Sequence, residues 1–305
     1  MKNNVKKLFL ICVGFILIGC SVNYSDVSKE DTKNNKIKIT WISGPSMLID
    51  FNGFKILTDP MLGTGKDAFV MGNSNEMFDL KKGPNIKTFT STINDINLNT
   101  REIDLVLISH AHEDHFDQKA QKELVFDTEM LIPLFDEKSI LNMGFTNASV
   151  LKPDETKVYN FNNSSIIITA VAAHHSKNKH IDSVLGEGNG YFIEFKRGTW
   201  KKTLYWTGDS FLTYETKESI AKLSSIDILV PHLGNVGVHG ALGQLSMNAK
   251  DVLEYSLYTK AKNILPIHHS TYDLYLEPIS KFEKISEKQD YILNVIKEGE
   301  TIVYQ

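Results

Sequence analysis

The sequence predicts an α/β (α+β) fold in which several strands end at histidine or aspartate residues. Three observations predict it. From Ile37 onward, short apolar strands come first, helices follow, and strands return towards the C-terminus. Five of the predicted strands stop just before a histidine or an aspartate. Hydrophobic residues make up 42% of the 305-residue chain, which is enough to bury a large core without disulfides.

The N-terminal segment has the pattern of a bacterial export signal. Met1–Lys7 carries three lysines, and Leu8–Gly19 is an apolar run too short for a comfortable transmembrane helix. The run ends in Leu17-Ile18-Gly19-Cys20, which resembles the lipobox of bacterial lipoproteins and predicts lipidation of Cys20. An ordinary secretory signal or an N-terminal membrane anchor is the alternative. Diacylation would supply the two acyl chains that stable anchoring requires, which places the protein on a membrane of the cell envelope.

The segment after Cys20 is polar up to Lys36 and is expected to be a flexible tether. The predicted organisation is therefore a signal peptide over 1–19, a lipidated N-terminus and tether over 20–36, and one folded domain over 37–305. Loss of residues 1–19 removes three lysines and lowers the formal net charge from −4 to −7. This acidic balance leaves no basic footprint for nucleic acid, so no nucleic-acid partner is expected.

The first predicted elements form an antiparallel hairpin followed by a long loop. The strands cover Ile37–Ile42, Ser46–Phe51 and Phe54–Thr58. Asn52-Gly53 is a strong signal for a two-residue hairpin turn, and Asp59-Pro60 stops the returning strand. Leu62–Asn99 is polar, rich in Gly, Asn and Thr, and poorly periodic, so we expect a long loop there.

The remaining elements alternate between apolar runs, typical of buried strands, and amphipathic stretches, typical of helices. The predicted strands are Ile103–Ile108, Met130–Phe135, Ser165–Ala172, Tyr191–Phe195, Thr203–Trp206, Ile226–Val230, Ile264–Ile267 and Thr301–Tyr304. The predicted helices are Gln118–Phe126, Glu137–Met143, Tyr214–Leu223, Asn248–Thr259 and Ile279–Lys288.

Chemically capable side chains follow the predicted strands at a recurring position. His110, His174, Asp209, His232 and His268 each stand just after the C-terminal end of an apolar strand. Loops at strand ends are where a rigid scaffold displays reactive groups. Several strands that deliver imidazole and carboxylate groups to one rim predict a metal site.

The segment His110-Ala111-His112-Glu113-Asp114-His115 is the strongest single signal. Imidazole and carboxylate are ligands that zinc and related metals accept. Side chains two apart point to the same side of an extended strand end, so His110 and His112 can share one ion. Asp114 and His115 follow the turn and can hold a second ion. The alternative, a solvated surface loop rich in histidine, does not explain the buried strand before the segment and the helix after it.

The pattern H-x-H-x-D-H is the signature of the metallo-β-lactamase superfamily, which this chain resembles. Further resemblances to its motifs lie at Thr58-Asp59-Pro60, Val171–Ser176, Thr207-Gly208-Asp209 and Pro266-Ile267-His268. They cover most of 37–305 and imply a four-layer αββα sandwich. Within the superfamily the chain looks similar to the group that contains L-ascorbate 6-phosphate lactonase and N-acyl-phosphatidylethanolamine phospholipase D.

The resemblance implies a set of seven ligands for two divalent metal ions. Zinc is the expected metal, with manganese or iron as alternatives. The first ion would be bound by His110, His112 and His174, and the second by Asp114, His115 and His268, with Asp209 as the bridge.

The expected activity is hydrolysis of a small ester, lactone or phosphodiester by a hydroxide that bridges the metals. Asp114 is expected to orient the water and shuttle its proton. Two alternatives stay open: hydrolysis of N-acyl phospholipids near a membrane, and a non-enzymatic metal-binding lipoprotein. Leu62–Asn99, with Phe69 and Phe78, is hypothesised to form a partly apolar lid over the substrate; the alternative is that these residues pack the loop onto the domain.

Three other residues keep two interpretations each, and a fourth, His175, has one expectation. His232 either faces the substrate as a catalytic group or hydrogen-bonds at its strand end. Asp59 either orients a ligand histidine or closes its turn. Asp117 either supports a ligand imidazole or caps the following helix. His175 is expected to point away from the metals, because it adjoins the predicted ligand His174 in an extended segment.

Overall fold

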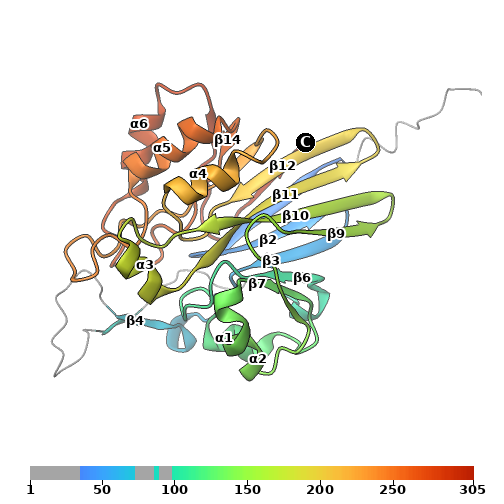
Figure 1. Cartoon of the computed structure of the whole chain (residues 1–305), viewed down its shortest axis with the longest axis horizontal. Coiled ribbons are helices and arrows are strands. Elements are labelled where there is room, and N and C mark those ends of the chain that lie inside the picture. Colours follow the sequence, from blue (N-terminus) through green and yellow to red (C-terminus); the bar gives the residue numbers. More distant parts are fainter. Residues whose placement is uncertain (1–34, 73–85, 89–97) are drawn as a thin grey trace, which may run out of the picture. The chain divides into compact units, whose positions relative to one another are not determined.

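The described part of the chain, residues 35–72, 86–88 and 98–305 of a computed structural model, is built around two seven-stranded sheets (Figure 1). The first sheet runs, in spatial order, β16 (Thr301–Tyr304), β1 (Ile37–Ser43), β2 (Ser46–Phe51), β3 (Phe54–Thr58), β6 (Leu105–Leu107), β7 (Met130–Ile132) and β8 (Ala148–Val150). The second runs β15 (Ile292–Leu293), β14 (Asn263–Ile264), β13 (Ile228–Val230), β12 (Trp200–Trp206), β11 (Gly188–Arg197), β10 (Ser164–Ala173) and β9 (Thr156–Phe161).

The main core lies between the two sheets. Alternate residues of each strand point to opposite faces, so one face of each sheet supplies this core. Ile39 and Trp41 of β1 and Ile193 and Phe195 of β11 belong to one buried apolar cluster with members from both sheets. The aromatic residue between the last two, Phe192, belongs instead to a second cluster on the other face of its sheet.

Helices cover the two outer faces, which makes four layers. On the first sheet, α1 (Gln118–Glu123) and α2 (Glu137–Asn142) pack through Ala120 and Ile140 against residues of β6 and β7. On the second, α4 (Tyr214–Ile220), α5 (Ala249–Thr259) and α6 (Ile279–Ser286) pack against Phe192 and Tyr205. The predicted αββα sandwich is confirmed.

Strand direction brings the carboxyl ends of many strands to one edge. In the first sheet β3, β6 and β7 are parallel, and in the second β12, β13 and β14 are parallel. β10 and β12 both run antiparallel to β11, so β10 also ends at the edge where β12 ends. The loops that carry the candidate ligands therefore begin at neighbouring strand ends.

The local predictions held where turn chemistry was strong. Asn52 and Gly53 have φ values of 54° and 91°, and Phe51 pairs with Phe54 across the predicted two-residue turn. The strand predicted over Met130–Phe135 ends at Ile132, because Pro133 begins a 3₁₀ turn over Leu134–Asp136.

The strands β8, β9 and β15 and the short helix α3 (Lys179–Leu185) were not predicted. The predicted long loop Leu62–Asn99 also contains structure, namely a 3₁₀ turn at Gly65–Asp67 and the antiparallel pair β4 (Val70–Gly72) and β5 (Ile86–Thr88). The predicted signal, Cys20 and most of the tether lie outside the described residues, as does Phe78. In the described part of the chain, no helix has the length and apolarity needed to cross a bilayer.

Candidate metal centre

Three imidazoles form a first cluster at the shared edge of the sheets. His110 and His112 follow β6, and His175 follows β10; one ring nitrogen of each lies within 4.8 Å of the others. Nε2 of His112 donates to the main-chain carbonyl of Leu185 at 2.9 Å, which leaves Nδ1 free to face a ligand. Nδ1 of His110 lies 3.0 Å from the Ser109 hydroxyl, and its Nε2 is buried without a hydrogen-bond partner.

The presence of His175 in this cluster corrects the predicted ligand His174 by one residue. Nδ1 of His174 pairs with Oδ2 of Asp182 in α3 at 2.7 Å, and His174 lines a separate cavity together with residues of α3 and α4. The two neighbouring imidazoles do serve different sites, as an extended segment requires. The sequence does not reveal at which residue the strand alternation ends, so the assignment of the two was reversed.

A second cluster lies beside the first. His115, Asp209, His232 and His268 bring side-chain nitrogen and oxygen atoms within 4.8 Å of one another, and both nitrogens of His232 already have hydrogen-bond partners. Nδ1 of His115 pairs with the buried carboxyl of Asp59 at 2.7 Å, and Nε2 has no partner. Nδ1 of His268 donates to the carbonyl of Leu233 at 2.8 Å, so its Nε2 is the nitrogen that faces the cluster.

The carboxylate of Asp209 stands between the two clusters. Its Oδ2 lies 3.4 Å from Nε2 of His115 in the second cluster and 3.4 Å from Nε2 of His175 in the first. Its Oδ1 lies 3.8 Å from Nε2 of His268. This is the position that a carboxylate shared by two cations requires.

Asp114 lies at the rim of the site. Its Oδ2 is 4.0 Å from Nε2 of His115, and its side chain is 22% exposed. It lines the cavity beside the clusters, so it can reach both a second cation and a bound water or substrate.

The predicted substrate-facing role of His232 does not fit its position. Its side chain is fully buried, and it is not among the residues that line the cavity. Nε2 accepts a hydrogen bond from the indole of Trp206 at 2.7 Å, and Nδ1 lies 2.8 Å from Oδ1 of Asp209. Burial lowers the pKa of His232 to about 3, so the ring is neutral. His232 is a buried hydrogen-bonding partner of Asp209.

The structure also resolves the two aspartates left open by the sequence. Asp59 supports a ligand histidine: besides His115, it accepts from the main-chain N–H and the hydroxyl of Ser109. Burial raises the pKa of Asp59, and the contacts with His115 and Ser109 oppose that rise. Asp117 caps α1 by accepting from Ala120 N and also accepts from Gly63 N, so it is a structural cap.

The electrostatics of the site favour a cation. Burial disfavours the charged form of Asp209, but the surrounding imidazoles of His268 and His115 outweigh it and hold the carboxyl pKa well below its ordinary value. Burial, together with the neighbouring imidazoles of His115, His112 and His175, lowers the pKa of His110 well below that of free histidine. The carboxylates of Asp209, Asp114 and Asp59 raise the pKa of His115 instead, although burial opposes them. An ionised, buried carboxylate among imidazoles is a typical ligand set for a divalent metal.

Unpartnered buried nitrogens give a direct test of whether metal fits. Nε2 of His110, Nε2 of His115 and Nδ1 of His175 in the clusters are buried and have no hydrogen-bond partner, as are Nε2 of His174 and Nε2 of His269 outside them. A buried polar atom without a partner costs about 1–3 kcal/mol. A cation bound at the clusters would give Nε2 of His110 and Nε2 of His115 the partner that they lack, so these residues fit a metal.

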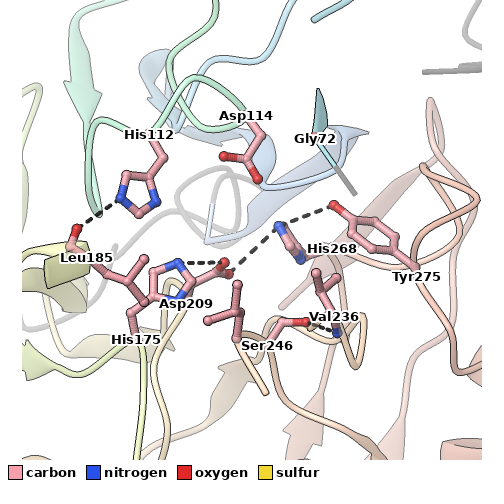
Figure 2. A pocket seen from close by; sticks show the side chains of 11 residues that line it. Gly72, His112, Asp114, His175, Leu185, Asp209, Val236, Ser246, His268 and Tyr275 are labelled. Carbon is pink, nitrogen blue, oxygen red and sulfur yellow. Dashed lines mark hydrogen bonds and ion pairs between the residues drawn. The ribbon is translucent and has the colours of Figure 1, made fainter. Parts of the chain in front are cut away.

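A cavity of about 160 Å³ opens beside the clusters (Figure 2). It is lined by Gly72, His112, Asp114, His175, Leu185, Asp209, Val236, Leu245, Ser246, His268 and Tyr275. Three of the lining residues, Leu185, Val236 and Leu245, are apolar; Leu185 lies beside His112 and Val236 beside His268 (Figure 2). Opposite the first cluster, the Tyr275 hydroxyl lies 3.3 Å from Nε2 of His268. Sequence reasoning missed Tyr275 and Leu185, which have no motif of their own.

Comparison with known proteins places this site in context. A family model described as "Beta-lactamase superfamily domain" matches residues 38–268. A "UPF0173 metal-dependent hydrolase" of Carboxydothermus hydrogenoformans is 25% identical over 268 residues, which covers 88% of this chain and all of that protein. The "N-acyl-phosphatidylethanolamine-hydrolyzing phospholipase D 1" of Caenorhabditis elegans is 23% identical and is matched over 82% of this chain and 70% of its own length.

Solved structures resemble the fold over most of the chain. An isothiocyanate hydrolase from Delia radicum gut bacteria superposes with a TM-score of 0.68 at 22% identity, covering 87% of this chain and 98% of that one. A possible metal-dependent hydrolase from Veillonella parvula superposes with a TM-score of 0.67 at 17% identity, with the same coverage. At these identities the likeness bears on the fold alone.

Proposed function

Because the chain belongs to the metallo-β-lactamase superfamily and is a metal-dependent hydrolase, we propose that it binds two divalent cations and cleaves a small ester, lactone or phosphodiester. The observation that carries the two-cation proposal is the position of Asp209, whose Oδ2 is 3.4 Å from an imidazole of each cluster. A carboxylate placed this way can be shared by one cation in each cluster.

The residues divide between the two cations. His110, His112 and His175 would hold the first, and His115, His268 and Asp114 the second, with Asp209 shared. Nitrogen and oxygen donors favour zinc, and manganese or iron also accept them. Bound cations would supply Lewis acidity and lower the pKa of a water towards neutrality.

The chain's own groups would complete the chemistry. Asp114 would orient the attacking water and accept its proton. It lines the cavity, and only its Oδ2 lies near His115, so its other oxygen would be available for the water. Burial raises the pKa of Tyr275 well above that of free tyrosine, so its hydroxyl stays protonated. It can donate a hydrogen bond to the substrate oxygen on which charge develops.

The size of the cavity supports a small reacting group. Its volume of about 160 Å³ is well below the roughly 300–1,000 Å³ of pockets that enclose drug-sized ligands. The apolar side chains of Leu185, Val236 and Leu245 would contact the non-reacting part of the substrate. Hydrolysis of N-acyl phospholipids is a second candidate, supported by these apolar side chains and by the likeness to the nematode phospholipase. A lid from 62–99 stays a hypothesis: Gly72 lines the cavity, but 73–85 and 89–97 lie outside the described residues.

The decisive experiment combines metal content with a substrate panel. Purified protein is analysed for metal and assayed with a p-nitrophenyl phosphodiester, a small lactone, a short-chain ester and vesicles containing an N-acyl phosphatidylethanolamine. We expect close to two ions per chain and turnover of at least one of the three small substrates. His239→Ala, at an exposed histidine, serves as the control for general effects of histidine loss. One ion per chain would refute the two-cation proposal, and turnover of the vesicle substrate alone would favour the lipid alternative.

We also propose that the mature protein is a lipoprotein of the cell envelope, anchored through Cys20. The lipobox-like Leu17-Ile18-Gly19-Cys20 supports this location. An anchored domain would meet small envelope metabolites or lipid headgroups rather than nucleic acid, in keeping with the acidic charge balance.

A further inference from the structure

Two buried hydrogen bonds connect Trp206, His232 and Asp209 in a row. Nε1 of Trp206 donates to Nε2 of His232 at 2.7 Å. Nδ1 of His232 lies 2.8 Å from Oδ1 of Asp209. The side chains of His232 and Asp209 are 0% and 4% exposed, and Trp206 is fully buried. Both hydrogen bonds of this row, called the Trp–His–Asp relay, are therefore buried, and only the Asp209 end of the row borders the cavity.

The chemistry of indole fixes the direction of both bonds. The indole N–H of Trp206 is a donor only, so Nε2 of His232 must be its acceptor. A neutral imidazole that accepts at one nitrogen carries its proton on the other. Nδ1–H therefore donates to Oδ1 of Asp209, and no nitrogen of His232 is left for a metal, although the ring lies close to the second cluster.

The imidazole of His232 is also held in orientation by its surroundings. Its ring stacks on that of His268 at a centroid distance of 4.8 Å and an interplanar angle of 3°. Its main-chain N–H donates to the hydroxyl of Thr207 at 3.3 Å, and a parallel bridge pairs it with Ile267. These contacts tie the relay to the segment that presents His268.

The relay distinguishes the two oxygens of the shared carboxylate. Oδ1 is occupied by the N–H of His232, whereas Oδ2 lies 3.4 Å from His115 on one side and His175 on the other. Without the relay, the carboxylate of Asp209 could rotate about its last side-chain bond and turn its plane, so that no oxygen would lie between His115 and His175. Hydrogen bonds from outer residues commonly orient metal ligands, and their loss costs 10–100-fold in affinity.

We propose that His232, locked by Trp206, is a positioning residue that holds Asp209 with Oδ2 between the clusters and so sets the affinity of the second cation. The inference rests on the proposed two-cation site. It assigns the retention of the second cation to a residue that is not itself a metal ligand. In this proposal His232 acts by donating its Nδ1–H to Oδ1 of Asp209, and not by the volume of its side chain.

Two substitutions at position 232 separate these roles. His232→Asn keeps a side-chain N–H near the place of Nδ1, and His232→Leu keeps comparable volume without a donor. Zinc content is measured after dialysis, and zinc affinity by competition with a chromophoric chelator, with circular dichroism to verify folding. We expect the wild type and His232→Asn to keep two ions, and His232→Leu to bind the second about 10–100-fold more weakly.

Trp206→Phe removes the hydrogen bond from the indole to Nε2 of His232 and leaves the imidazole in place. Tyr205→Phe is its matched control. Tyr205 is an equally buried neighbour whose hydroxyl bonds Tyr255 on the helix-covered face of the sheet, away from the relay. We expect a weaker second cation for Trp206→Phe only. Nitrogen-15 NMR of the zinc-loaded wild type should show the His232 proton on Nδ1, a readout that holds even if His232→Leu fails to fold.

The outcomes separate the relay from the proposed function. A wild type with fewer than two ions overturns the proposed function, and this inference with it. Two ions in the wild type together with unchanged affinity in His232→Leu overturns the relay alone. So does equal weakening in His232→Asn and His232→Leu, which would show a packing role, or a proton found on Nε2.

Discussion

Replacing Asp59 with asparagine should weaken the second cation through a change in hydrogen bonding rather than in shape. One carboxyl oxygen of Asp59 accepts from Ser109 N at 2.6 Å, and the other accepts from the Ser109 hydroxyl and from Nδ1 of His115. An amide of the same shape has one acceptor oxygen and an NH₂ donor group. Either Ser109 N–H or His115 Nδ1–H must then face a donor inside the protein.

The expected size of the effect follows from this count. One buried donor without an acceptor costs about 1–3 kcal/mol, so the free energy of unfolding should fall by about that amount. If asparagine turns its NH₂ towards His115, the imidazole loses its orienting partner, and second-cation affinity should fall about 10–100-fold. That loss corresponds to about 1.4–2.7 kcal/mol of binding free energy.

Asp117→Asn is the matched control for this experiment. Asp117 also uses both oxygens as acceptors, from Ala120 N and Gly63 N, but contacts no ligand imidazole. It should lose comparable stability in a denaturant melt while keeping zinc affinity in a chelator competition. If Asp59→Asn bound both ions as tightly as the wild type, or if Asp117→Asn weakened them equally, the assignment of Asp59 to His115 would be refuted.

Four further expectations follow. Asp209→Ala should keep the fold by circular dichroism yet lose more activity than the roughly 10–100-fold typical of outer partners, and unchanged turnover would remove Asp209 from the site. Tyr275→Phe should lower kcat about 100-fold if the hydroxyl stabilises developing charge, whereas a change in KM alone would restrict it to substrate binding. Asp227 ties three parallel strands: burial would raise its pKa, but Lys262 and Thr203 hold it below the ordinary value. Its stabilising effect is therefore present above the unfolded pKa of about 3.9 and lost as pH falls through the lower folded pKa, and pH-dependent melts of Asp227→Asn should lack that acid decline. Cys20→Ser should leave the protein unprocessed or soluble in a membrane fractionation, and a processed, tightly bound variant would contradict lipidation at this position.

The sequence predicted the layered fold and most of the residues that converge in the candidate metal centre because both depend on local signals. Apolar runs of strand length, a hairpin turn at Asn52-Gly53 and dense ligand chemistry at His110–His115 are each readable within a short window. Asp209 and His268 were found because they follow buried strands. All of these side chains do converge at one edge of the sheets.

The errors concern relations between distant segments. Whether His174 or His175 enters the site depends on where the alternation of β10 stops, and a single residue of slip exchanges the two. Helix α3 was missed because its seven residues are too few for a helical period, although Asn178 is a favourable N-cap that accepts from His180 N and Ile181 N. The burial of His232 depends on Trp206, 26 residues away, and no local pattern reports that contact.

Main-chain groups, rather than side chains, orient two of the ligand imidazoles. The carbonyl of Leu185 fixes His112, and the carbonyl of Leu233 fixes His268. At Leu185 the side chain meanwhile forms part of the apolar lining of the cavity. A mutation there can reshape the surface that selects a substrate while the carbonyl keeps its hold on the histidine. At Leu185, the orientation of His112 and the apolar surface of the cavity are therefore set by different groups of one residue, so a substitution can change the second and keep the first.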